Sequence, residues 1–74
     1  MSIDAWNYRI VEEKDGNMGL HEVYYFNDGT PQLMTERAIC LDRYTNRIDM
    51  LLDMKKMIKD LKRFPEVLSY KEFK

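Results

Sequence analysis

Cysteine and histidine are almost missing from this sequence, which limits the chemistry it can perform. The single cysteine, Cys40, has no partner for a disulfide within the chain, and we expect a reduced thiol in a small apolar site. The single histidine, His21, does not make a zinc site with scattered carboxylates alone, and we expect a structural role for it. No phosphate-binding glycine loop, HExxH or Cys-x-x-Cys motif occurs. The sequence therefore predicts no enzyme, no catalytic residue, no metal site, no cofactor and no identifiable small-molecule ligand.

Long apolar runs and low-complexity segments are missing too. No stretch reaches membrane-spanning length, and Met1–Asp4 lacks the basic and apolar regions that begin a signal peptide. With 45% hydrophobic residues, 34% charged residues and only three glycines, the composition is that of a folded chain with a charged surface. A chain of 74 residues has room for one core. We expect a single cytoplasmic domain over residues 1–74, with no membrane contact.

The sequence does contain two consecutive β-hairpin patterns, closed by Asp15-Gly16 and Asp28-Gly29. Asp-Gly between alternating apolar runs favours a tight turn, because both residues tolerate positive φ. Strands are predicted over about 6–13, 18–26 and 30–37. Pro31 cannot donate a hydrogen bond to a neighbouring strand, so the third strand is predicted at an edge. The expected sheet is a three-stranded antiparallel meander in the order 1-2-3.

The first turn leaves two strand registers open. A two-residue turn at Asp15-Gly16 pairs Tyr8 with Val23. It collects five apolar residues on one face: Trp6, Tyr8, Ile10, Val23 and Tyr25. A three-residue turn with a bulge at the glycine shifts the register by one residue and pairs Tyr8 with Glu22. We favour the first register, because it also pairs Arg9 with Glu22 across the other face.

One amphipathic pattern, from about Asn46 to Arg63, predicts a C-terminal helix that Pro65 ends. Apolar residues recur at helical spacing and form a stripe, which we expect to cover the sheet: Ile48, Leu51, Met54, Ile58 and Leu61. Asp60 then lies on the solvent side. The predicted fold class is α+β, with the element order β-β-β-α in two layers.

The sheet face opposite this helix is unusually apolar in the favoured register, and methionines widen the helical stripe. Apolar patches of this kind normally have a partner. We therefore predict an interaction surface formed by Val11, Leu20, Tyr24, Phe26, Leu33, Met50 and Met57. The partner is either the tail folded back through Val67, Leu68 and Tyr70, a second copy of the chain, or another protein.

Charge is distributed unevenly along the chain. Residues 1–37 hold three basic and seven acidic residues, a sum of −4, and residues 42–64 hold seven basic and four acidic residues, a sum of +3. A basic helix is typical of nucleic-acid contacts. In this helix, however, acidic residues alternate with the basic ones, and residues 1–37, which hold the predicted strands, are acidic. We expect a small non-catalytic protein-interaction module, a homodimer being one form of it. The alternative is a nucleic-acid-binding module that uses the basic helix face.

Several short segments resemble a group of short bacterial and phage-borne hypothetical proteins. The segments are Trp6–Glu12, Gly19–Tyr25, Asp28-Gly29, Thr35-Glu36 and Val67–Tyr70, and the most specific is His-Glu-Val-Tyr-Tyr at 21–25. The resemblance covers most of the chain. It implies a small cytosolic protein and no particular activity. The helix departs from the acidic helices of that group, which puts a shared partner of this helix in doubt.

Overall fold

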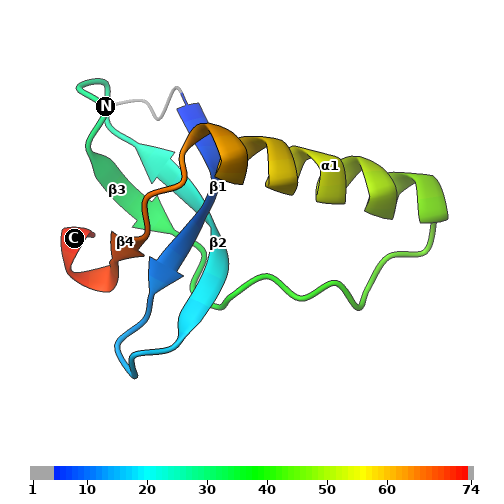
Figure 1. The fold of residues 1–74 in the computed structure, drawn as a ribbon, viewed down its shortest axis with the longest axis horizontal. Coiled ribbons are helices and arrows are strands. Elements are labelled where there is room, and N and C mark those ends of the chain that lie inside the picture. Colours follow the sequence, from blue (N-terminus) through cyan, green and yellow to red (C-terminus); the bar gives the residue numbers. More distant parts are fainter. Residues whose placement is uncertain (1–4, 74) are drawn as a thin grey trace.

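The helix and the hairpins lie where the sequence predicts them, with one addition at the C-terminal end. The computed structural model describes residues 5–73. The elements in chain order are β1 (Ala5–Glu12), β2 (Met18–Tyr25), β3 (Pro31–Met34), α1 (Arg47–Arg63), β4 (Leu68–Ser69) and the short 3-10 helix η1 (Tyr70–Glu72). The α+β class is confirmed (Figure 1).

The sheet has four strands in the order β3-β2-β1-β4, so the prediction of a three-stranded sheet is wrong. The predicted meander is present, and β3, with Pro31, lies at its edge. The tail adds β4 on the other side, parallel to β1, with Val11 opposite Leu68 and Glu12 opposite Ser69. The sequence of the tail alternates only weakly, but burial of Leu68 holds it against the sheet.

The first turn has the bulged geometry. The Glu13 amide donates to the Asn17 carbonyl at 2.8 Å, and the Gly16 amide donates to the Glu13 carbonyl at 2.9 Å. Gly16 has a φ of 88°, while no non-glycine residue of the described chain has a positive φ. A two-residue type I′ turn would require positive φ at Asp15 as well. The connection is therefore a three-residue turn, and Asp15 caps it by accepting from the Asn17 amide.

The observed register pairs Tyr8 with Glu22, so the favoured register is wrong and the alternative is correct. A shift of one residue exchanges the faces on which the side chains of the two strands meet. The side of the sheet that faces α1 includes Trp6, Tyr8, Ile10, Leu20, Tyr24 and Leu33, together with Glu22 opposite Tyr8. The prediction that Leu20, Tyr24 and Leu33 lie opposite the helix is therefore wrong, since all three lie on its side of the sheet.

The other side of the sheet holds the most deeply buried apolar residues. Val11 and Val23 are fully buried there and form a cluster with Leu68 from β4. Four partly buried side chains pack against this cluster: Tyr25, Met34, Tyr70 and Phe73. Val23 and Tyr25 therefore contact the tail and not the helix, which corrects the predicted core.

α1 begins as predicted, with the Asn46 side chain accepting hydrogen bonds from the amides of Ile48 and Asp49. Its orientation differs from the prediction. Only Met57 and Asp60 of this helix are buried, and the C-terminal end of α1 lies next to β1 while the other end extends away from the sheet (Figure 1). The ammonium of Lys56 lies 4.6 Å from the centroid of the Trp6 ring. The helix thus turns a partly charged face toward the sheet.

Candidate functional site

The most exposed apolar surface of the helix is a single stripe directed away from the sheet. Its large apolar members are Ile48, Leu51, Leu52 and Ile58, with exposed fractions of 64%, 40%, 59% and 53%. Lys55, Lys59 and Lys62 are exposed as well and continue the same spacing of three and four residues. We call these seven residues the outward face of α1. They carry three positive charges and no carboxylate.

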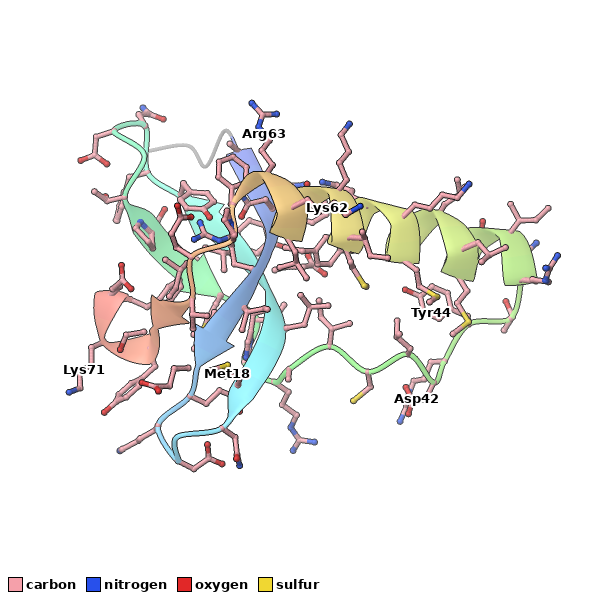
Figure 2. The ribbon with its side chains drawn as sticks, in the orientation of Figure 1. Met18, Asp42, Tyr44, Lys62, Arg63 and Lys71 are labelled. Carbon is pink, nitrogen blue, oxygen red and sulfur yellow. The ribbon has the colours of Figure 1, made fainter. Side chains whose placement is uncertain are left out.

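The opposite side of the helix is covered by the chain itself, which explains why the stripe faces solvent. The connection between β3 and α1 runs back along the helix (Figure 1). Tyr44 lies in this connection (Figure 2). Its hydroxyl donates a hydrogen bond to Asp53 in α1 at 2.6 Å. That hydrogen bond raises the pKa of Tyr44 to about 12. The Asp60 carboxylate of α1 also accepts a hydrogen bond from the Tyr8 amide of β1 at 2.9 Å, so the polar side of the helix is held and its apolar side is left open.

The residues of the predicted interaction surface do not form one surface. Val11 is fully buried under the tail, and Met57 is buried as well. Leu20, Tyr24, Phe26 and Met50 are half-buried, and Leu33 is 48% exposed. Of the tail residues, Leu68 and Tyr70 do fold back within the chain, but they cover Val11 and Val23.

The interaction surface predicted from the sequence does not include Ile48, Leu51, Leu52 or Ile58, which are the apolar residues of the outward face. Helical spacing predicts Ile48, Leu51 and Ile58 in the core, and Leu52 is not part of that prediction. The signal was present in the sequence, because residues 48, 51, 52, 55, 58, 59 and 62 follow one helical stripe. Helical periodicity identifies a stripe, but it does not tell whether the stripe is packed against the same chain.

The His21 side chain lies on the side of the sheet that the C-terminal tail covers, and both of its ring nitrogens make polar contacts. It is 1% exposed, its Nδ1 lies 2.9 Å from the Thr35 carbonyl oxygen, and its Nε2 lies 2.6 Å from Glu13 Oε2. Thr35 Oγ1 is also 3.0 Å from Nδ1, so hydroxyl, imidazole and carboxylate are in contact. The carbonyl oxygen can only accept, so Nδ1 donates in this contact, while Nε2 is engaged by the Glu13 carboxyl group. This leaves no nitrogen free to take a proton from the Thr35 hydroxyl, and the cluster joins strand to turn.

The remaining chemical candidates are sparse. Cys40 is exposed, with its sulfur 3.9 Å from the Ala38 carbonyl oxygen, which corrects the expected apolar site. Among the described residues no group of three or more histidine, cysteine, aspartate or glutamate side chains is arranged to hold a metal ion. Over the same range no helix has the length and apolar character needed to cross a membrane.

Comparisons with protein-family models, with curated proteins and with solved structures found no match to this chain.

Proposed function

We propose that this protein is a non-catalytic protein-interaction module that docks its partner on the outward face of α1. The observation that supports this most is the exposure of four large apolar side chains, 40% to 64%, along one helical stripe. Contiguous apolar surface on a small folded chain marks a place where another molecule binds. Binding through the apolar residues of an amphipathic helix, spaced three and four residues apart, is a common mode of protein recognition.

The partner we propose is an acidic protein surface that also presents apolar side chains. Lys55, Lys59 and Lys62 lie among and beyond the exposed apolar residues, and no carboxylate shares the outward face. Two copies pairing through this face would bring lysines against lysines, and like charges across an interface reduce affinity. We therefore propose a different chain as the partner, in preference to a homodimer formed through this face.

A nucleic acid is the second candidate, because the three lysines could also contact phosphates. Phosphate contacts are electrostatic and release counterions, whereas exposed isoleucine and leucine side chains contribute nothing to them. The two candidates therefore differ in the role they give to Leu52 and Ile58.

Paired substitutions separate the two candidates. Leu52→Ser with Ile58→Ser removes apolar area and keeps the charge, and Lys55→Gln with Lys59→Gln does the reverse. For a protein partner we expect each pair to reduce the amount of one discrete protein that the tagged chain captures from an extract of its host. For a nucleic acid we expect the lysine pair alone to reduce retention on DNA. Met18→Ser is the matched control, since Met18 is 65% exposed on the sheet (Figure 2). If both pairs behave as the wild type, the outward face of α1 is not the docking surface.

We also propose a cytosolic location, which the resemblance to short bacterial and phage-borne proteins implies. The proposal that the protein is not an enzyme is supported by His21, whose ring nitrogens are both engaged. Fractionation of host cells tests the location, and recovery of the chain in a membrane or extracellular fraction would contradict it.

A further inference from the structure

A pocket of about 520 Å³ lies where β1 begins and β2 ends, apart from the outward face of α1. Three aromatic residues line it, Tyr25, Phe26 and Phe64, and Trp6 borders it, although the Trp6 ring lies on the side of the sheet that faces α1. Its polar side chains come from Asn7, Arg9 and Asn27. A pocket of this size, mostly apolar with a few polar groups, is typical of sites for small organic molecules.

Arg9 is the unusual member of this wall, because it is a buried cation with few partners. It is 7% exposed. Its Nη1 donates to the Tyr25 hydroxyl at 3.3 Å, and its Nη2 donates to the Glu66 carbonyl at 2.8 Å. Its Nε has no hydrogen-bond partner among residues 5–73. A guanidinium has five N–H donors, so the partners that the chain supplies do not satisfy it.

The negative charge that faces Arg9 is also weak. Glu66 Oε2 lies 3.6 Å from Arg9 Nη2, and the Glu66 side chain is 75% exposed. An exposed carboxylate at that distance is well screened by water and salt. A buried guanidinium with incomplete compensation is costly, and a bound anion would reduce that cost.

A second guanidinium, that of Arg63, lies against the Phe64 ring, although Arg63 is not itself part of the pocket lining. The Arg9 guanidinium lies 5.6 Å from the centroid of the Phe64 ring, and the Arg63 guanidinium lies 5.3 Å from it. Figure 2 shows Arg63 at the end of α1 that lies next to β1. Two arginines against the Phe64 ring, with Tyr25 and Phe26 in the same lining, favour a ligand that is both aromatic and anionic.

We propose that this pocket binds a small aromatic carboxylate. A planar guanidinium can bind both oxygens of a carboxylate through parallel hydrogen bonds, and the aromatic lining residues match a flat ring. The proposal does not depend on the docking role of α1, since the two sites share no residue.

Benzoate is the probe that tests the proposal, with benzamide as its neutral isostere and acetate as the anion without a ring. A titration followed by two-dimensional ¹H–¹⁵N NMR reports backbone amides together with the side-chain Nε–H of Arg9. We expect saturable shifts with benzoate at Asn7, Arg9 and Asn27, and much weaker binding of benzamide and acetate. Equal binding of benzoate and benzamide would overturn the assignment of an anion site, and shifts that avoid these residues would overturn the pocket itself.

Variants of exposed residues keep the test independent of folding. Glu66→Gln removes the competing carboxylate, and we expect it to tighten benzoate binding about two- to fivefold. Arg63→Gln removes the second cation, and we expect it to weaken binding by a similar factor. Arg9→Lys should weaken binding about tenfold or more if it folds, because lysine lacks the planar fork. A Glu66→Gln variant that binds benzoate no better than the wild type contradicts the proposal, even if the Arg9 variant fails to fold.

Discussion

The carboxylate of Asp60 in α1 accepts a hydrogen bond from the backbone amide of Tyr8 in β1 at 2.9 Å. The same oxygen accepts from the Lys56 ammonium at 3.0 Å. β4 pairs with β1 only at Val11 and Glu12, so this amide lies on an edge that no strand covers. Asp60 takes the place of the missing strand, and the helix is held to the sheet by a polar contact as much as by apolar packing.

Substitution of Asp60 tests this anchor. Asp60→Ala leaves the buried Tyr8 amide without its acceptor, and we expect a loss of about 1–3 kcal/mol in the free energy of unfolding. Asp60→Asn keeps an acceptor oxygen and should lose less. The measurement is urea denaturation followed by circular dichroism, with Lys59→Ala, an exposed neighbour, as the control. Equal midpoints for the Asp60→Ala and Lys59→Ala variants would show that the anchor contributes nothing.

Gly19 makes room for the contact between Glu13 and His21. A Cβ atom at position 19 would lie 2.4 Å from Glu13 Oε2 and 3.0 Å from the Ala38 Cβ. We expect Gly19→Ala to displace the carboxylate and to cost about 1–3 kcal/mol of stability. The cost should be smaller when Glu13→Ala is already present, because the main clash is then gone. A double-mutant cycle measures this, and additive costs would mean that the carboxylate is not what Gly19 accommodates.

Because of Tyr44, the free energy of unfolding is expected to depend on pH in the alkaline range. Its pKa is raised from 10.0 to about 12, chiefly by the hydrogen bond to Asp53. The folded state keeps the proton at pH values where the unfolded chain has lost it, so stability falls between pH 10 and about pH 12. Tyr44→Phe removes this contribution and should flatten the fall. Denaturation of both proteins from pH 9 to 12 checks it, and parallel curves would contradict the assignment.

Exposed and buried leucines should differ sharply in their effect on folding. Leu68 lies in the buried cluster with Val11 and Val23, and Leu68→Ala should cost about 2–5 kcal/mol. Leu52 is 59% exposed, and Leu52→Ala should change stability by no more than about 0.5 kcal/mol. Thermal and urea denaturation compare them. A large loss for Leu52→Ala in the isolated monomer would mean that the outward face of α1 is packed within the chain.

The sequence predicts the number of hairpins and the bounds of the helix because these depend on local chemistry. Asp15-Gly16 and Asp28-Gly29 mark both turns, and Asn46 begins the helix. The turn type was not determined locally, because Asp-Gly suits both the two-residue turn and the bulged three-residue turn. The absence of a positive φ at Asp15 and the pairing of Glu13 with Asn17 identify the bulged turn. This turn shifts the strand register by one residue, which exchanges the sheet faces predicted for the side chains.

The orientation of α1 could not be predicted, because it depends on contacts between distant parts of the chain. Periodicity places Ile48 and Ile58 on an apolar stripe, which normally faces the core. The hydrogen bonds of Asp60 to Tyr8 and of Asp53 to Tyr44 turn the helix the other way. The candidate docking surface follows from that rotation, so the sequence yields its residues but not their exposure.

The central claim, that the outward face of α1 docks an acidic protein partner, is tested most directly by site-specific photocrosslinking in host cells. A photoreactive phenylalanine analogue at position 52 should yield one discrete protein adduct, and the same analogue at position 18, equally open to solvent, should not. The adduct should disappear when Lys55 and Lys59 are both changed to Glu, because charge reversal repels an acidic partner. No adduct from position 52, or an adduct that the charge reversal leaves unchanged, would contradict the claim.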